Sequence, residues 1–216
     1  MSDIRPVLIA RFTRLGRLAG LFVRIKLRIF PLFDLAEQVP LKGKVLDLGC
    51  GRGLLGLALM LMSEHRQVFG MDLDVDNVAR TVGAFARRGR CVVGDLQHLP
   101  FRGLLDCIVL SDILYLIPNA MHGAILKACY GLLAPGGVLL LKEMNTRPRW
   151  KFIWNWIQET VAVKVVGWTL GNRFYFQDRA SFVALMRQCG FEVEVIPLDR
   201  GYWYPHIVYR GVKGDG

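Results

Sequence analysis

The sequence predicts an α/β fold with an open, mostly parallel sheet and helices on both faces. Short apolar runs alternate with helical patterns along the chain, which is typical of a parallel sheet. Three glycines stand at alternate positions after the first apolar run, as where a strand turns into a helix. The 216 residues are enough for one well-buried core. The apolar runs predict strands near residues 44–48, 67–72, 91–94, 106–111 and 137–143.

The first predicted strand leads into the segment KVLDLGCGRG, residues 44–53. Val45, Leu46 and Leu48 indicate a buried strand. The glycines that follow let a ligand lie against backbone that any Cβ would block. Residues 51–56 also spell the G-x-G-x-x-G of dinucleotide-binding folds. The glycines alone therefore do not select the cofactor.

The second predicted strand ends in an acid, Asp72. Asp74 is placed to cap a helix that runs from about residue 75 to residue 88. A carboxylate has two acceptor oxygens and can bind two ligand hydroxyls at once. Because Asp74 fills the capping role, we expect Asp72 to contact a ligand; the alternative is that Asp72 only caps the helix.

Three further segments follow in order: GDLQHLPF at 94–101, LDCIVLSD at 105–112 and LAPGGVLLL at 133–141. Pro100 keeps the loop after the third strand out of a helix. Gly136 and Gly137 come after a helical pattern and before an apolar run, so they predict a left-handed residue that ends the helix.

Together these segments resemble the class I S-adenosylmethionine-dependent methyltransferases of the small-molecule type. The order of the segments carries the resemblance more than the glycine motif does. It implies a Rossmann-like, open, mostly parallel seven-stranded sheet with helices on both faces and an antiparallel last strand. Two late apolar stretches, residues 191–197 and 206–212, would form an antiparallel pair at the sheet edge.

The resemblance implies S-adenosylmethionine as the cofactor. Asp72 matches the position that binds the ribose hydroxyls, Asp95 the position that meets the adenine amino group, and the amide of Leu96 the position that meets a ring nitrogen. Ser111 ends the strand that carries the floor of the site. Cys50 is expected to serve packing within the turn rather than to act as a reactive thiol. The implied cofactor-binding residues are Asp47, Gly49, Cys50, Gly51, Gly53, Asp72, Leu73, Asp95, Leu96 and Ser111.

Two other functional classes stay open at this point. An NAD-dependent oxidoreductase would use residues 51–56 to hold a pyrophosphate, but Asp95 and residues 135–137 would then have no role. A non-catalytic adapter that keeps the fold is also compatible, because the sequence contains no unambiguous catalytic residue. Binding of S-adenosylmethionine or of NADH would separate these classes.

The connection at residues 198–205 is expected on the cofactor side, because the carboxyl ends of the strands meet there. His206 is therefore a candidate general base, since an unperturbed imidazole with a pKa of about 6.5 suits proton removal at neutral pH. Tyr115 and His122, just after the fourth strand, are rival candidates. Ordinary packing is the alternative for each of them.

Residues 111–114 read S-D-I-L, where methyltransferases acting on base amino groups or glutamine often carry D/N-P-P-Y/F. This difference favours transfer to oxygen or carbon over transfer to nitrogen, on an apolar, aromatic or lipid-like small molecule. The four histidines and five cysteines lack ligand spacing, so no metal site is expected. The odd, scattered cysteines favour a reducing, cytoplasmic location.

Residues 1–40 are predicted to form a basic amphipathic extension before a methyltransferase domain at 41–216. Residues 4–33 contain no acid, and seven basic residues against one acid give residues 1–30 a charge of +6 of the chain's formal +10. No stretch is apolar enough to span a bilayer. The composition predicts that residues 4–30 contact an anionic membrane surface, form a lid that packs on the domain, or do both.

A second extension, residues 147–176, is expected to cap the substrate, and it holds four of the five tryptophans. An aromatic, basic-flanked cap suits an apolar substrate with an acidic head or carrier, and an acidic acyl carrier protein would fit the charge. An RNA substrate ranks lower, because the basic residues are threaded through apolar sequence of mean hydropathy +0.33. The expected location is the cytoplasm. If residues 4–30 contact a membrane, the protein would attach peripherally to its inner face.

Overall fold

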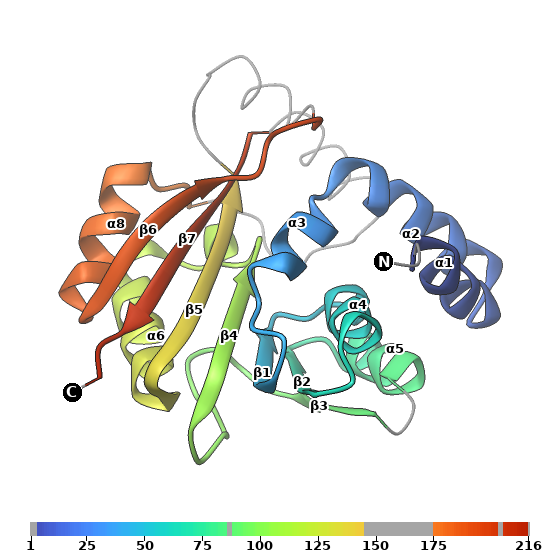
Figure 1. Cartoon of the computed structure of the whole chain (residues 1–216), viewed down its shortest axis with the longest axis horizontal. Coiled ribbons are helices and arrows are strands. Elements are labelled where there is room, and N and C mark those ends of the chain that lie inside the picture. The colour runs from blue at the N-terminus through green and yellow to red at the C-terminus, as the bar shows by residue number, and fades with distance from the viewer. Residues whose placement is uncertain (1–3, 86–87, 145–174, 203–204, 216) are drawn as a thin grey trace.

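The centre of the structure, a computed structural model that describes residues 4–85, 88–144, 175–202 and 205–215, is a seven-stranded sheet. The strand order is β3-β2-β1-β4-β5-β7-β6 (Figure 1). The first five strands run parallel, and β7 is antiparallel to both β5 and β6, which confirms the predicted sheet. The strands are β1 (Gly43–Leu48), β2 (Arg66–Asp72), β3 (Gly89–Val93), β4 (Leu105–Ser111), β5 (Leu133–Met144), β6 (Phe191–Pro197) and β7 (His206–Lys213).

Helices cover both faces of the sheet, as predicted (Figure 1). One face carries α4 (Leu54–Met62) and α5 (Val75–Phe85), and the other carries α6 (Asn119–Leu132) and α8 (Arg179–Gln188). The amino-terminal helices lie on the α4 side: α1 (Arg5–Arg14), α2 (Arg17–Ile29) and α3 (Leu32–Glu37). A 3-10 turn, η1 (Leu114–Leu116), follows β4.

Strand β5 shows why the central strands appear as continuous apolar runs in the sequence. Val138 and Leu140 belong to the core cluster on the α4 side, whereas Leu139 and Leu141 belong to the cluster on the α6 side. A parallel strand covered on both faces buries every side chain, so the alternation typical of a half-exposed strand is lost.

Gly136 and Gly137 do not end a helix, which corrects the sequence prediction. Helix α6 ends earlier, and its cap residue Leu133 is already extended, with ψ of 142°. Gly136 has φ of 69° inside the first part of β5, where the pairing with β4 shifts register. A Cβ on Gly137 would lie 2.8 Å from the Ala134 carbonyl oxygen, so these glycines permit an irregular strand entry rather than a helix cap.

The amino-terminal helices pack on the domain, as one of the two sequence alternatives expected. Leu8, Phe12 and Val23 are at most 1% exposed and belong to the core cluster on the α4 side. Helices α1 and α2 approach closely, because a Cβ on Gly20 would lie 2.2 Å from the hydroxyl oxygen of Thr13. Glycine at this position therefore sets the close packing of the pair.

Within the described ranges, no helix combines the length and the apolar character that crossing a membrane requires. The predicted substrate cap at 147–176 falls outside the described residues except for Tyr175 and Phe176. Helix α5 is described from Val75 to Phe85, and residues 86–87, before the predicted helix end at residue 88, lie outside the described ranges.

Candidate functional site

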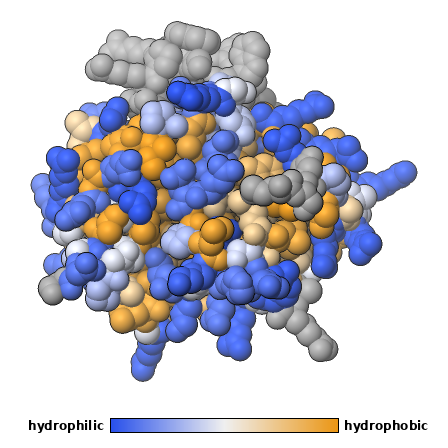
Figure 2. Space-filling view, viewed as in Figure 1, coloured by the Kyte–Doolittle hydropathy of each residue, from blue (hydrophilic) through white to orange (hydrophobic). Residues whose placement is uncertain are grey.

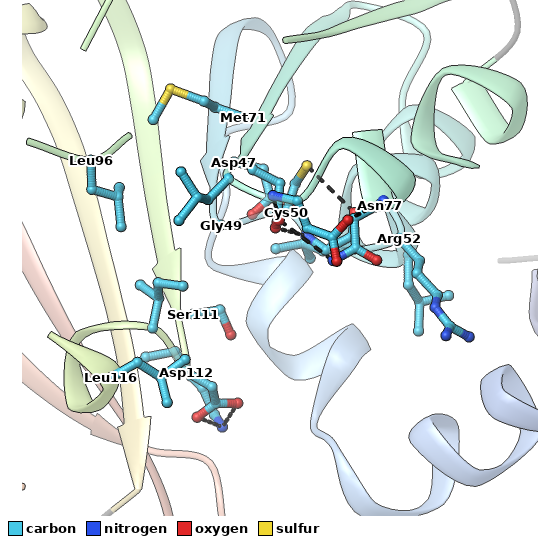
Figure 3. A pocket seen from close by; sticks show the side chains of 18 of the residues that line it. Asp47, Gly49, Cys50, Arg52, Met71, Asn77, Leu96, Ser111, Asp112 and Leu116 are labelled. Carbon is cyan, nitrogen blue, oxygen red and sulfur yellow. Dashed lines mark hydrogen bonds and ion pairs between the residues drawn. The ribbon is translucent and has the colours of Figure 1, made fainter. Parts of the chain in front are cut away.

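A cavity of about 970 Å³ lies at the carboxyl ends of the parallel strands (Figure 3). This is the edge at which open α/β sheets bind ligands, and the volume suits a small-molecule site. Its walls come from the turns after β1, β2, β3 and β4, the ends of β5 and β7, and helix α2. Every predicted cofactor-binding residue lines it except Gly53.

The turn after β1 depends on glycine at three positions. Gly49, Gly51 and Gly53 have φ of 72°, 53° and 74°, a region that side-chain-bearing residues rarely adopt. A Cβ on Gly53 would also lie 2.6 Å from Cγ2 of Thr81 on α5. Gly53 is therefore required by the close approach of α5, which explains why it does not line the cavity.

Backbone and side-chain hydrogen bonds hold this turn against the end of β2. The amides of Gly49 and Cys50 donate to the Met71 carbonyl at 2.7 and 3.0 Å. The amide of Gly51 donates to Oδ2 of Asp72 at 2.7 Å. Asp72 lines the cavity and is only partly buried, so its carboxylate shapes the turn and remains accessible from the cavity.

Asp74 caps α5, as the sequence predicts. Its Oδ1 accepts from the amides of Asp76 at 2.8 Å and Asn77 at 3.3 Å. The cap leaves Asp72 to its contacts with the turn and the cavity, although Oδ1 of Asp72 also accepts from the Asp74 amide at 3.0 Å. The capping role predicted for Asp74 is therefore confirmed, and the ligand contact predicted for Asp72 stays a prediction.

Asp47 is the most strongly perturbed acid of the cavity. Its side chain is 3% exposed, and Oδ2 has no hydrogen-bond partner among the described residues. Burial, together with the nearby charge of Asp72, raises the pKa of Asp47 to about 7. A buried carboxylate oxygen without a donor at a cavity wall is suited to a positively charged ligand group such as an ammonium.

The predicted adenine and floor residues also reach the cavity. Asp95 and Leu96 line it after β3, and Oδ1 of Asp95 accepts from the Gln97 amide at 3.0 Å. Ser111 lines it at the end of β4, and its buried hydroxyl has no partner among the described residues. Figure 3 shows Leu96 and Ser111 on one side of the view and Asp47 with the glycine turn on the other.

Cys50 is buried in the turn and its sulfur lies 3.5 Å from that of Cys91 on β3. Gly70 on β2 makes room for both sulfurs, because a Cβ there would lie 2.9 Å from the Cys50 sulfur. The hydrogen bond with Cys91 and burial both raise the pKa of the Cys50 thiol. A thiol held in its neutral form is a poor nucleophile, which favours the packing role expected from the sequence.

His206 lines the cavity, but its surroundings disfavour a general base. Its Nε2 lies 2.9 Å from the Ile29 carbonyl oxygen, so this nitrogen carries the proton and donates. Burial and the charge of Lys142 lower the pKa of His206 to about 3. A group with so low a pKa accepts a proton poorly at neutral pH, and the bond instead fixes the end of α2 to β7.

Of the two rival candidates, only Tyr115 reaches the cavity. Tyr115 lines it and stacks on Phe176 with ring centroids 5.6 Å apart. His122 is fully buried behind η1, where Nε2 lies 2.8 Å from the carbonyl oxygens of both Leu114 and Ile117. His122 does not line the cavity, which corrects its nomination as a catalytic candidate.

Two buried charged residues at the end of β5 were missed by the sequence analysis. Lys142 is fully buried and its Nζ donates to Oδ1 and Oδ2 of Asp112 at 2.6 and 2.5 Å. Glu143 is 3% exposed, and its Oε1 accepts from the Leu114 amide at 3.0 Å, which positions η1. Burial, with the charge of Asp112, raises the pKa of Glu143 to about 8. Two adjacent charged residues directly after the apolar run 138–141 were the sequence signal that could have indicated buried charges there.

Helix α2 supplies the cavity wall that lies outside the sheet. Phe22, Ile25, Ile29 and Phe30 line the cavity from this helix and its end. The Arg52 guanidinium of the glycine turn lies 4.7 Å from the centroid of the Phe22 ring, a cation–π distance that links the wall to the turn. The alternatives predicted for this segment included a lid on the domain, but none of its residues was predicted to line the site.

Comparison with known proteins finds a methyltransferase domain in part of the chain. Residues 45–137 match the family model described as a methyltransferase domain. A ubiquinone biosynthesis O-methyltransferase of Psychrobacter arcticus is 32% identical over 113 residues, which cover 49% of this chain and 42% of that protein. The carboxy-S-adenosyl-L-methionine synthase of Chromohalobacter salexigens is 36% identical over 111 residues, covering 48% and 41%. The chain spans less than half the length of these curated relatives.

Solved structures share the fold over most of the chain. The S-adenosylmethionine-dependent methyltransferase SibL in its apo form superposes with a TM-score of 0.70 at 20% identity, covering 91% of this chain and 57% of SibL. The magnesium protoporphyrin IX methyltransferase of Synechocystis PCC 6803 gives a TM-score of 0.62 at 21% identity, covering 85% and 80%. These similarities extend the likeness of fold beyond residues 45–137.

Proposed function

Because the chain carries a class I S-adenosylmethionine-dependent methyltransferase domain, we propose that it transfers the cofactor's methyl group to a hydroxyl of an apolar small molecule. The observation that carries this proposal is the buried Asp47 oxygen, which lacks a donor and faces the same cavity as the glycine turn and Asp72. When bound, S-adenosylmethionine supplies a methyl group on a positively charged sulfur, which is an excellent leaving group.

The described residues offer a place for each part of the cofactor. Asp47 would pair with the ammonium of its amino acid portion, and Asp72 would accept from its ribose hydroxyls. Asp95 and the Leu96 amide, both at the cavity, would hold the adenine. Holding the methyl group and the acceptor oxygen in line supplies much of the acceleration for such a reactive donor.

The part of the cavity toward β5 and α2 suits an apolar acceptor. Ile25, Ile29, Phe30 and Met144 line it there. Transfer to oxygen is supported by the curated relatives that are named O-methyltransferases and by the segment S-D-I-L in place of the amine-directed tetrad.

The test is calorimetric titration of the chain with S-adenosylmethionine, S-adenosylhomocysteine and NADH. We expect both adenosyl ligands to bind and NADH not to bind. In Asp72→Asn, the binding free energy of both adenosyl ligands should weaken by about 1.5 to 3 kcal/mol, which is the contribution of hydrogen bonds to a charged group. Glu64→Gln, at an exposed acid outside the cavity, is the matched control and should bind as the parent does. Binding of NADH alone would favour an oxidoreductase, and no binding at all would favour an adapter.

We further propose that the first part of α2, through Leu18 and Leu21, contacts an anionic membrane surface. Leu18 is 81% exposed and Leu21 is 53% exposed, and they share one helix face with Ile25 and Ile29 by spacings of three and four residues. Figure 2 shows apolar and hydrophilic side chains next to one another over the region of α1 and α2. The cations that border this face are Arg17, Arg24 and Arg28, all exposed. Apolar residues beside arginines match an anionic lipid surface in both charge and polarity.

Flotation with vesicles that contain anionic lipid tests this contact. The double variant L18E/L21E should lose most of its flotation, because it replaces two exposed leucines with acids that the anionic surface repels. L41E is the control, since Leu41 is 68% exposed at the opposite, amino-terminal edge of the sheet. Flotation of the parent should weaken at high salt. If L18E/L21E floats as well as L41E, α2 does not contact the membrane.

A further inference from the structure

Asp112 and Lys142 lie in the part of the cavity that the cofactor residues leave open. Asp112 follows β4, and Lys142 pairs in register with Ser111 on β4 and with Val208 on β7. Both residues line the cavity together with Met144. Asp47, by contrast, lies on β1, one strand away from Asp112 in the direction of β2. The pair therefore belongs to the acceptor side of the site.

The backbone of Asp112 is held in an unfavourable conformation. Its φ of 52° is the only positive φ of a residue other than glycine within the described ranges. Two contacts to one residue hold it there: the Asp112 amide donates to the Lys142 carbonyl at 2.9 Å, and the Lys142 ammonium bonds both carboxylate oxygens. Strain of this kind persists where the surroundings over-determine it, and it is found at functional sites.

The ion pair is closed on the protein side and accessible on the cavity side. The Lys142 side chain is 0% exposed, whereas the Asp112 side chain is 26% exposed. Each carboxylate oxygen has two lone pairs, so Asp112 can accept a further hydrogen bond from a ligand. Nζ of Lys142 has three donors, and its hydrogen bonds among the described residues all go to Asp112, with the Phe30 ring centroid 4.9 Å away.

We propose that Asp112 and Lys142 form the subsite that binds the acceptor's hydroxyl, an inference that rests on the proposed function. As the oxygen attacks, the oxygen–methyl bond forms and the sulfur–methyl bond breaks, with its electron pair remaining on the sulfur. The hydroxyl proton passes to the Asp112 carboxylate and leaves through its exposed side. Lys142 positions Asp112 and stabilises negative charge on the attacking oxygen.

This chemistry restricts the acceptor to an acidic hydroxyl, as in a phenol or an enol. A carboxylate is a weak base and removes a proton efficiently only when the acceptor is itself acidic. Burial lowers the pKa of Lys142, against the opposing influence of Asp112, so its charge acts in a poorly solvated environment where it interacts strongly with an oxyanion. The rings of Phe22 and Phe30 line the same cavity and suit a flat aromatic acceptor.

The probe for this subsite is 4-nitrophenol, titrated into the protein loaded with S-adenosylhomocysteine, because only its ionised form absorbs visible light. In the parent, the bound phenol should donate to Asp112, so the visible absorbance should fall on binding. In Asp112→Asn, the phenolate should replace the missing counter-ion of Lys142, so the absorbance should rise. Asn tolerates a positive φ, so this variant keeps the backbone conformation.

Affinity and turnover separate the two residues. Lys142→Met should lower the affinity for 4-nitrophenol by about 10- to 100-fold, while the affinity for S-adenosylhomocysteine changes little. Lys213→Met, at the far end of β7, is the control and should leave the affinity for 4-nitrophenol unchanged. Methylation of 4-nitrophenol should persist in Asp112→Asn, because the bound phenolate has no proton left to lose, whereas methylation of unsubstituted phenol, which is protonated at neutral pH, should fall about 100-fold or more. A purely structural role would lower binding and turnover together.

The outcomes that overturn the inference are distinct from failure of the proposed function. The same absorbance change in the parent and in Asp112→Asn, or an unchanged affinity in Lys142→Met, would remove the pair from acceptor binding. Binding of S-adenosylhomocysteine without any binding of 4-nitrophenol would overturn the phenol subsite and leave the methyltransferase proposal intact. Absence of S-adenosylhomocysteine binding to the parent would instead contradict the proposed function.

Discussion

Replacing Asp47 with asparagine is expected to lower the affinity for S-adenosylhomocysteine roughly 100-fold. Removing one charge of a buried ion pair costs about 3 kcal/mol of binding free energy. The ligand keeps the ammonium that Asp47 would bind, and no other described group donates to the Asp47 Oδ2 oxygen. Asparagine has nearly the same shape, so the glycine turn should keep its conformation. Calorimetric titration gives the affinity, and Glu64→Gln serves again as the control.

The same residue predicts a pH dependence of binding. The pKa of Asp47 is raised to about 7 by burial and by the charge of Asp72, and only the ionised carboxylate pairs with an ammonium. Affinity should therefore fall by about tenfold for each unit of pH below 7 and level off above it. Asp47→Asn should remove this dependence, and a slope that survives in the variant would assign it to another group.

The stability of the unliganded protein should depend on pH in the opposite sense. Because the pKa of Asp47 is raised in the folded state, its contribution is fully present below its unfolded value of 3.8 and is lost as the pH rises through about 7. Asp47→Asn should therefore raise the free energy of unfolding above pH 7 while it weakens binding. Denaturant titrations at several pH values measure this, and a variant less stable than the parent at pH 8 would contradict it.

Replacing Arg66 with alanine is expected to reduce the free energy of unfolding by about 3 to 5 kcal/mol. Arg66 is 3% exposed, and burial lowers its pKa. Its guanidinium joins the end of α3 to α4 by donating to four backbone carbonyls, at distances of 2.7, 3.1, 3.3 and 2.7 Å. These carbonyls belong to Pro40, Leu59, Ala36 and Val39. Without the arginine, they lose their donor in the protein interior.

Chemical denaturation of Arg66→Ala and Arg90→Ala gives the comparison. Arg90 lies exposed on β3, so its replacement should change the free energy of unfolding by no more than about 0.5 kcal/mol. Arg66→Met restores much of the packing but none of the hydrogen bonds, and it should remain close to Arg66→Ala in stability. If Arg66→Met matches the parent, packing rather than the carbonyl contacts accounts for the effect.

The features predicted from the sequence are those set by local pattern. The glycine turn, the acid after β2 and the apolar strands are each determined by residues adjacent in the sequence. The structure brings Asp47, Asp72 and Asp95 to one cavity as expected. The mostly parallel sheet was predictable because parallel strands need crossover connections, and these were visible as helical patterns; the antiparallel last strand was implied by the family resemblance.

The features missed depend on contacts between distant segments. Lys142 and Arg66 are charged, and pattern analysis treats such residues as solvated unless the partner is known. The partner of Lys142 lies 30 residues away, and the bond from His206 to Ile29 spans 177 residues. Which residues of α2 line the cavity depends on these long-range contacts, so the amphipathic pattern could suggest a lid but could not name the residues of the wall.

Helix α2 presents its apolar face to two environments at once. Ile25 and Ile29 line the cavity, and Leu18 and Leu21 continue the same face outward. Since one helix carries both pairs of residues, a ligand that restrains Ile25 and Ile29 also restrains Leu18 and Leu21. A surface that binds Leu18 and Leu21 restrains the cavity wall in the same way. Thermodynamic linkage then requires reciprocity. If contact of Leu18 and Leu21 with a surface raises the affinity of the cavity for its ligand by some factor, ligand binding raises the affinity for that surface by the same factor.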